Sequence, residues 1–356
     1  MQSTFPIRVA GTLALAHGTA VLFLSLHTPL PWVLGPLLAT AMASMLGAQT
    51  QSWTPLRNIG QWVIGTALGL YFTPQVTALV GRLWWAIVLG IVWALLLGWL
   101  FGRWLHAVVR GSLPGTDAEQ RATSYFAGAV GGASEMTLLA ERAGARTDLV
   151  AAAHSLRLLI VTLTVPSAMT WLGQHGIDPT LPGPREVHGV GLLLLAAGTG
   201  FGAWVMARTG RANPWFIGAL LVAMGLTMAG VDLSGVPQWM TNTAQLLIGV
   251  SLGVRFSAGF IRTAPRWLAT VAAGTFVMIA LCAGFAALLG WSTRLHWATL
   301  VLGTSPGGIA EMAITAKVLQ LGVPIVTAFQ VCRLIAVLVL VEPLFRWQYR
   351  SASLSA

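Results

Sequence analysis

Long apolar runs, separated by short polar and basic stretches, follow one another along almost the whole chain. No Asp, Glu, Lys or Arg occurs between Val9 and Leu56, and the windows 58–81 and 83–102 are equally free of charge. Each window can hold helices of about 20 residues, the length that crosses the hydrocarbon core of a bilayer. The pattern therefore predicts an all-α, multi-pass membrane protein.

The apolar segments fall into two halves with the same order. In the first half they cover 9–26, 31–48, 59–80, 84–101, 122–145 and 149–172. In the second half they cover 189–207, 214–231, 243–260, 266–290, 296–319 and 323–343. A polar, Pro-rich stretch separates the halves, so we expect a first transmembrane repeat at 1–173, a linker at 174–188 and a second repeat at 189–356.

Short sequence words recur in the two halves and support the duplication. PWVLGPLL at 31 recurs as PWFIGALL at 214, and NIGQWVIGTALGLYF at 58 recurs as NTAQLLIGVSLGVRF at 242. The second pair contains a GxxxG word in each half, Gly65–Gly69 and Gly249–Gly253. We interpret these words as sites of close helix packing, with ligand contact as the alternative.

Polar side chains precede both GxxxG words at helical spacing. Asn58 and Gln61 lie on one stripe in the first half, and Asn242 and Gln245 match them in the second. Such side chains hydrogen-bond between helices or form the wall of a polar site. The sequence leaves both interpretations open.

The third repeated word carries charge inside apolar segments. GAVGGASEM at 128 recurs as TSPGGIAEM at 304, each followed by an Arg-Leu pair 22 residues after the glutamate. The residues concerned are Gly131, Gly132, Glu135 and Arg157 in the first half and Gly307, Gly308, Glu311 and Arg333 in the second. Because an ionisable side chain in lipid is costly, these residues are candidates for a functional site.

The Gly-Gly pairs predict a break in each apolar segment. Glycine permits backbone conformations and close approaches that a hairpin tip or a broken helix requires. The residues that follow, beginning with Ser134 in the first half, would start a half-helix whose N-terminal N–H groups favour an anion. The carboxylate of Glu135 or Glu311 can be satisfied by its own helix, can bind a proton or sodium ion, or can form a structural ion pair with Arg157 or Arg333.

One difference between the halves concerns proton transfer. His154 lies one turn before Arg157, whereas Gln330 occupies the matching position before Arg333. Histidine changes charge near neutral pH, so His154 is the candidate proton carrier. The two halves are therefore not chemically equivalent.

The placement of basic residues bears on topology. If all segments cross the membrane, the basic loop residues divide almost equally between the two sides. If each Gly-Gly segment is a re-entrant hairpin, 13 lie on one side and 4 on the other, the four being Arg82, Arg185, Arg294 and Lys317. That asymmetry is what the positive-inside rule expects. It gives about ten transmembrane helices plus two hairpins or broken helices, with the two repeats inverted relative to one another.

Composition narrows the class of protein. The 356 residues are 56% hydrophobic and 8% charged, far from the roughly 25% charged content of soluble domains. The net charge of +10 comes from arginines scattered over loops, which argues against nucleic acid as a partner. Neither Cys282 nor Cys332 lies in a CxxC word, and the histidines show no metal-ligand spacing, so we expect no metal, cofactor or disulfide framework.

The doubled GGASEM and GGIAEM words, the trailing RLLIV and RLIAV and the paired PWxxGxLL words resemble the AbrB-duplication family of bacterial inner-membrane proteins. Members carry two labels, regulator of gene expression and ammonia monooxygenase, and these residues argue for neither. In its organisation the family is similar to cation/proton antiporters and anion transporters, which implies transport by analogy. The chain lacks the paired Asp of the antiporter branch.

These observations favour a secondary transporter or exporter of a small anionic or zwitterionic organic solute, coupled to protons or sodium ions. Glu135 and Glu311 would bind the coupling ion, and Arg157 and Arg333 would balance charge or bind the solute. The alternative is an integral-membrane regulator of gene expression that acts through a partner or through solute levels. We expect no enzymatic activity, a location in the bacterial inner membrane, and partners limited to the bilayer, the solute and its coupling ion; a homodimer is compatible with this plan.

Overall fold

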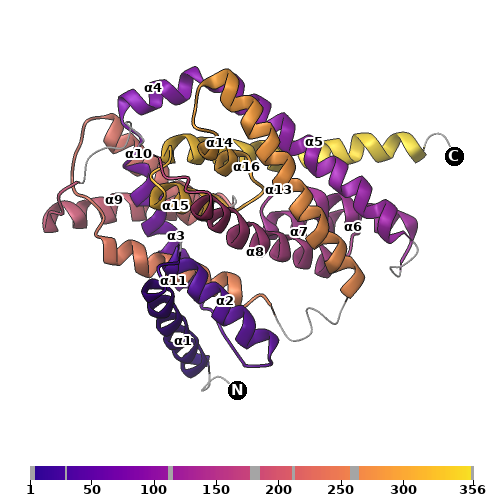
Figure 1. Cartoon of the computed structure of the whole chain (residues 1–356), viewed down its shortest axis with the longest axis horizontal. Coiled ribbons are helices and arrows are strands. Elements are labelled where there is room, and N and C mark those ends of the chain that lie inside the picture. Colours follow the sequence, from indigo (N-terminus) through magenta and orange to yellow (C-terminus); the bar gives the residue numbers. More distant parts are fainter. Residues whose placement is uncertain are drawn as a thin grey trace. The chain divides into compact units, whose positions relative to one another are not determined.

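The computed structural model describes residues 5–28, 30–110, 115–176, 185–210, 213–256 and 264–353, and these ranges contain helices and no strands (Figure 1). Residues 177–184, the centre of the expected linker, lie outside the described residues. The chain forms two compact units. The first comprises Met1–Gly81, Pro166–Phe260 and Ala310–Pro324, and the second comprises Arg82–Val165, Ile261–Ile309 and Ile325–Ala356. Each unit therefore contains segments from both halves of the sequence.

The helices of the two halves follow one another in matching order. Those of the first half are α1 (Phe5–Ser25), α2 (Pro31–Met45), α3 (Thr54–Gly69), α4 (Pro74–Arg82), α5 (Trp84–Val109), α6 (Asp117–Gly128), α7 (Ala133–Arg142) and α8 (Thr147–Trp171). Those of the second half are α9 (Gly189–Arg208), α10 (Pro214–Met228), α11 (Gln238–Gly253), α13 (Pro265–Thr293), α14 (Trp297–Thr304), α15 (Ile309–Val318) and α16 (Val323–Ser353). Helices α2 and α10 have 15 residues each, α3 and α11 have 16, and α7 and α15 have 10.

Equivalent helices also begin in the same way. Helices α2 and α10 each start at a proline, which lacks the N–H that a first helical residue leaves unbonded. The residues before them, Leu30 and Asn213, both adopt the left-handed conformation, with φ of 51° and 46°. The repeated PW word thus encodes the same helix start twice.

Glycines in the first unit bring helices of opposite repeats into backbone contact. A Cβ atom on Gly65 or Gly69 of α3 would collide with the backbone or side chains of α10, at Phe216 and Ala223. In the matching contact, a Cβ atom on Gly249 of α11 would lie 2.7 Å from Val33 O of α2. The GxxxG words therefore pack helices, α3 on α10 and α11 on α2, as the first interpretation of these words predicted.

A second pair of glycine contacts is also repeated within the first unit. A Cβ atom on Gly35 of α2 would lie 2.8 Å from Thr19 O of α1, and Gly218 of α10 meets the backbone of Gly202 in α9 in the same way. Each packing contact that α1, α2 and α3 make thus has a counterpart made by α9, α10 and α11. The internal duplication is therefore visible in the packing as well as in the sequence.

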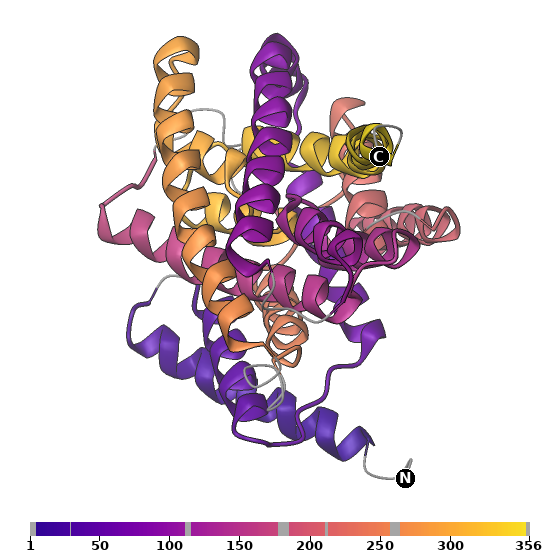
Figure 2. The same ribbon diagram turned by 90° about the vertical axis from the view of Figure 1, so that its right-hand side faces the viewer.

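In the second unit the equivalent helices α5 and α13 pack side by side (Figure 2). Gly274, near the start of α13, lies against Phe101 in the second half of α5. Further along α13, Phe285 stacks on Trp93, with ring centroids 4.7 Å apart. As the residue number rises in α13 it falls in α5, so the two helices are antiparallel.

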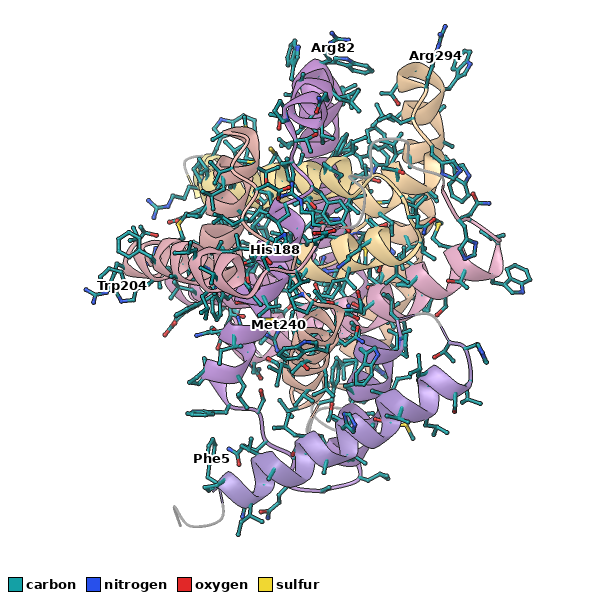
Figure 3. All side chains as sticks on the ribbon, turned by 90° about the vertical axis from the view of Figure 1, so that its left-hand side faces the viewer. Phe5, Arg82, His188, Trp204, Met240 and Arg294 are labelled. Carbon is teal, nitrogen blue, oxygen red and sulfur yellow. The ribbon has the colours of Figure 1, made fainter. Side chains whose placement is uncertain are left out.

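The antiparallel packing decides between the two topologies. If every apolar segment crossed the membrane, α5 and α13 would cross in the same direction, whereas hairpins at the Gly-Gly segments make them cross in opposite directions. Arg82, before α5, and Arg294, after α13, lie toward the same end of the second unit (Figure 3). The antiparallel pair agrees with inverted repeats, the arrangement that the charge distribution predicted.

Six of the described helices are long and apolar enough to cross a membrane, namely α1, α5, α8, α9, α13 and α16. The number becomes seven if α3 and α4, which meet at a bend of 90°, form one broken span. Helices α2 and α10 are apolar but shorter, and a 15-residue helix is only about 22 Å long. The chain is a multi-pass membrane protein. The ten crossings expected from the sequence would have to include helices of only 15 or 16 residues.

Candidate functional site: two broken helices held by buried arginines

The repeated Gly-Gly word interrupts a helix in each repeat. In the first repeat α6 ends at Gly128 and α7 begins at Ala133. In the second repeat α14 ends at Thr304 and α15 begins at Ile309. The end of a helix leaves carbonyl groups without partners, and these groups carry partial negative charge. Each break therefore needs a donor inside the protein.

Arg157 supplies the donors in the first repeat. Its guanidinium donates hydrogen bonds to the carbonyl oxygens of Ala127, Gly128 and Ala129, each at 3.0 Å. The side chain is almost fully buried, at 3% exposed, and projects from α8 in the second unit. Arg157 therefore holds the C-terminal end of α6 and partly neutralises its dipole.

Arg333 does the same in the second repeat. It donates to Ser305 O at 2.5 Å and to Gly307 O at 2.9 Å, just beyond the end of α14. It projects from α16 and is also buried, at 6% exposed. Ala129 and Ser305 are equivalent positions. Each arginine therefore binds the carbonyl group at this position of its own repeat.

His154 and Gln330 complete the two networks at equivalent positions. His154 Nε2 lies 2.9 Å from Phe126 O, and His154 Nδ1 lies 2.8 Å from a guanidinium nitrogen of Arg157. Since the guanidinium can only donate, His154 is the neutral tautomer, with the proton on Nε2. A second proton would place another cation against Arg157, so this geometry favours a structural role for His154 over the proton transfer that its sequence position suggested.

Two buried polar atoms in the second network have no partner. Gln330 donates from Nε2 to Leu302 O at 2.7 Å and to Ser305 O at 3.2 Å, but its Oε1 accepts no hydrogen bond. Arg333 Nε, one turn away, donates none. Leaving a buried donor or acceptor unpaired costs about 1–3 kcal/mol, so a polar partner at either atom would be stabilising.

The two helix breaks that the arginines bind lie near each other in the second unit. Cys282 Sγ donates to Thr304 O, at 3.4 Å, and packs in one buried cluster with Val130, just after α6. All of the hydrogen bonds given above for Arg157 and Arg333 go to carbonyl groups or to His154. In the described part of the second unit, no carboxylate forms an ion pair with either arginine, so the two positive charges are only partly compensated.

Glu135 folds its side chain back toward the start of its own helix. It is the third residue of α7, whose N-cap is Gly132, and its carboxylate folds back so closely that a Cβ atom on Gly132 would collide with Oε2. A Cβ atom on Gly131 would lie 2.8 Å from Met136 Cε. The side chains of Glu135 and Met136 thus fill the space beside the Gly-Gly pair, and the anion at this helix N-terminus is Glu135 itself.

Glu311 lies in the first turn of α15 and belongs to the first unit. It is buried, at 7% exposed, and the charges that act on it are those of Arg255 and Arg57, in the same unit. Glu135 and Arg157 belong to the second unit together, yet among the described residues no ion pair joins them. The structural Glu135–Arg157 ion pair, one of the open alternatives, is therefore not observed.

The polar residues of the GxxxG stripe belong to the first unit. Gln61 Nε2 donates to Asn213 Oδ1 at 3.1 Å and so links α3 to the start of α10. Asn242 accepts from Gln238 at 2.8 Å within α11, and Asn58 lies half-buried in α3. Of these three side chains, Gln61 forms a hydrogen bond that links two helices. This bond agrees with the interpretation that the polar stripe joins helices to one another.

Sequence reasoning missed the backbone carbonyls that the arginines bind, because no side-chain pattern records them. It also missed a third glycine contact. A Cβ atom on Gly128 would lie 2.6 Å from Gly98 O and 2.7 Å from Gly102 Cα, so α5 and α6 touch where α6 ends. The word GWLFG at 98–102 was the signal available for this contact.

The fold and the site define a duplicated, multi-pass helical membrane protein with one arginine-bound helix break in each inverted repeat. Among the described residues, no three His, Cys, Asp or Glu side chains are grouped closely enough to hold a metal ion.

The chain belongs to the AbrB family, whose profile, described as "Transition state regulatory protein AbrB", matches residues 8–349. It is 29% identical over 330 residues to "Putative regulator AbrB" of Escherichia coli (strain K12), with 89% of each chain covered. It is 24% identical over 343 residues to "Uncharacterized protein YhjN" of Bacillus subtilis (strain 168), with 88% of this chain and 86% of that protein covered.

Proposed function

We propose that the chain is a secondary transporter of a small anionic or zwitterionic organic solute, coupled to protons or sodium ions, in the bacterial inner membrane. The observation that carries this proposal is the pair of buried arginines, Arg157 and Arg333. They come from equivalent positions of the two repeats and bind two neighbouring helix breaks, without a carboxylate partner in the described part of their unit.

The helix ends compensate these charges only in part. The C-terminal end of a helix carries roughly half a negative charge, so two helix ends offset about one of the two positive charges. The remaining positive charge favours an anion. Arg333 Nε can donate to a carboxylate of that anion, and Gln330 Oε1 can accept from an amine or hydroxyl group. This combination favours amino acids and hydroxy acids over simple inorganic anions.

The arrangement also supports alternating access. In transporters built from inverted repeats, broken helices meet near the membrane midplane and one repeat moves against the other. Here each break is tied to a long helix of its own repeat by one arginine, Arg157 to α8 and Arg333 to α16. An anion that contacts both arginines would therefore couple the two repeats.

The glutamates are assigned to the coupling ion. Glu311 is buried in the first turn of α15, and Glu135 lies in the first turn of α7, each beside a Gly-Gly break. Protonation or sodium binding at either carboxylate would change the charge at the N-terminus of a half-helix. The site as proposed binds and moves solute and carries out no covalent chemistry.

The test begins with ligand screening of the purified protein. Amino acids, hydroxy acids and mono- and dicarboxylates are added singly at millimolar concentration, and a ligand is scored by the rise in Tm that binding produces. Solutes that stabilise the protein are then tested for counterflow in proteoliposomes. We expect Arg333→Gln to weaken binding about 30-fold or more, since the buried charge contact is lost. The exposed Arg294→Gln serves as the matched control.

The second candidate is an integral-membrane regulator of gene expression, and the names of the family and of the Escherichia coli relative favour it. A regulator acting through solute levels would still transport. A regulator that acts through a partner would show no counterflow, whether or not it binds a solute. Wild-type counterflow in Arg157→Gln and Arg333→Gln vesicles would rule out the proposed solute site.

A further inference from the structure

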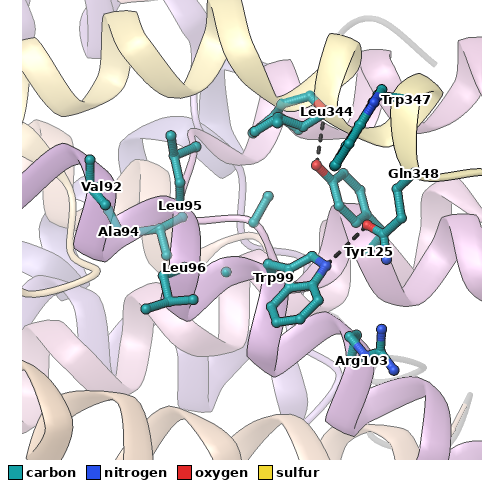
Figure 4. A pocket seen from close by; sticks show the side chains of 14 residues that line it. Val92, Ala94, Leu95, Leu96, Trp99, Arg103, Tyr125, Leu344, Trp347 and Gln348 are labelled. Carbon is teal, nitrogen blue, oxygen red and sulfur yellow. Dashed lines mark hydrogen bonds between the residues drawn. The ribbon is translucent and has the colours of Figure 1, made fainter.

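The second unit contains an apolar cleft between α5, the end of α6 and α16 (Figure 4). Its volume is about 440 Å³. The apolar walls come from Val92 and Leu96 on α5, from Val130 after α6, and from Val341 and Leu344 on α16. Val92, Leu96 and Leu344 are exposed, as expected of side chains that face lipid.

Polar groups gather toward the Arg103 end of α5 in this cleft. Trp99 Nε1 donates to Gln348 Oε1 at 3.1 Å, and Tyr125 Oη donates to Val341 O at 2.9 Å (Figure 4). The Arg103 guanidinium lies over the Trp99 ring, 5.1 Å from its centroid. Tryptophan and tyrosine with arginine beside them are typical of the membrane–water interface.

The cleft has the length of one leaflet. Val92 and Arg103 are eleven residues apart on α5, which corresponds to roughly 16 Å along a helix axis. Half of a typical hydrocarbon core is about 15 Å thick. A chain that lies in the cleft with its polar end at Arg103 would therefore end near the middle of the bilayer.

The charge at the mouth of the cleft is positive. Arg103 is exposed and forms no ion pair with a described residue. The nearby acidic residues are already paired, Asp117 with Arg121 and Glu342 with Arg346. Arg103 is therefore the cation available to a ligand, and a neutral ligand would leave this charge unused.

We infer that this cleft binds an anionic phospholipid, with one acyl chain along α5 and the phosphate at Arg103. The chain would contact Ala129 and Val130, which directly follow α6 and precede the Gly-Gly break. Ala129 O is one of the carbonyls that Arg157 holds. The lipid would thus support the broken helix from outside, whether or not the protein transports a solute.

The experiment uses the purified full-length protein, to which phosphatidylglycerol or phosphatidylcholine with the same acyl chains is added, and counts bound lipid by native mass spectrometry. Arg103→Gln removes the cation, and Leu96→Trp fills the apolar part of the cleft. The matched control is Arg208→Gln, because Arg208 lies over Trp204 at 4.4 Å in the same i, i+4 arrangement but does not line this cleft.

We expect the wild-type protein to retain phosphatidylglycerol in preference to phosphatidylcholine. Arg103→Gln should lower phosphatidylglycerol binding about fivefold, the effect of one basic residue near an anionic head group. Leu96→Trp should lower the binding of both lipids, and Arg208→Gln should change neither. Each variant is first checked for unaltered Tm and a single symmetric peak in size-exclusion chromatography.

Three results would overturn the inference. Equal losses in Arg103→Gln and Arg208→Gln would mean that surface charge alone attracts the lipid. Unchanged binding in Leu96→Trp would place the acyl chain elsewhere. Dissociation of a dimer by Leu96→Trp, with the lipid count unchanged, would show that the cleft is occupied by a second copy of the chain.

Discussion

His154 and Gln330 bind the same carbonyl position of the two repeats: His154 Nε2 lies 2.9 Å from Phe126 O, and Gln330 Nε2 lies 2.7 Å from Leu302 O. An imidazole and an amide are chemically different, but each offers one N–H donor at this point. The duplication has therefore preserved a hydrogen bond while the residue type changed. The difference lies in the second polar atom, which in His154 accepts from Arg157 and in Gln330 has no partner.

This equivalence predicts that the first repeat tolerates glutamine. His154→Gln keeps a donor for Phe126 O and should lower Tm only slightly. His154→Leu leaves Phe126 O and one guanidinium N–H without their His154 partners, which should cost about 1–3 kcal/mol for each buried group. Thermal unfolding in detergent measures both. Equal loss in the two variants would show that the ring shape, and not the hydrogen bond, is required.

The Gly132–Glu135 contact predicts a coupled pair of mutations. Gly132→Ala introduces a Cβ atom where the Glu135 carboxylate lies, and this carboxylate is the far end of a flexible side chain that can move aside, so the destabilisation should stay below about 1 kcal/mol. In a Glu135→Ala background the same change should cost less still, because the atom in collision is gone. The double-mutant cycle gives the coupling energy. Additive effects would contradict the contact, and Glu135→Ala is the control for loss of the carboxylate alone.

The glycine contacts in the first unit predict a difference between two residues of similar helical position. Gly65→Val forces side-chain atoms into the backbone of Phe216 and should lower stability by about 1–3 kcal/mol. Gly225→Val adds the same β-branched side chain to α10 where nothing lies within 4 Å. Its effect should stay within about 0.5 kcal/mol. Similar losses of Tm in the two variants would mean that the cost comes from helix propensity and not from packing. The repeated GxxxG word would then have another explanation.

Inverted repeats predict which face of the membrane two labels reach. In a chain with Cys282→Ala and Cys332→Ala, single cysteines are introduced as Gly81→Cys and Thr180→Cys. With re-entrant Gly-Gly segments both positions lie on the side with few basic residues, so an impermeant thiol reagent should label both from outside intact cells. In a chain of twelve crossings they would lie on opposite sides. Labelling of one position alone would therefore refute the inverted arrangement.

Much of the fold followed from repeated words, because glycines and prolines constrain the backbone wherever they occur. The starts of α2 and α10, the packing of α3 on α10 and the breaks after Gly128 and Thr304 were all encoded in this way. The inversion required charge counting as well, since the words alone do not give direction. The antiparallel packing of α5 and α13, given by the contacts Phe101–Gly274 and Trp93–Phe285, agrees with it.

The partners of the arginines could not be predicted in the same way. Sequence reasoning offered Glu135 or a solute carboxylate for Arg157, because a buried cation suggests a side chain of opposite charge. The observed partners in the protein are the carbonyls of Ala127, Gly128 and Ala129, which every residue type carries. Their availability depends on where α6 ends, and that end is visible only in the folded chain.

The pairing of α2 with α11 and of α10 with α3 has a consequence for how such a protein arises. A polypeptide equal to one half would expose the glycine faces of its own α2 and α3 and could cover them only with those of a second, oppositely oriented copy. A half-length polypeptide of this plan would therefore need two copies inserted in opposite orientations. A single chain with both halves has no such requirement, since it supplies both orientations itself. The halves of the present chain, expressed as separate polypeptides, should accordingly be stable together and degraded alone.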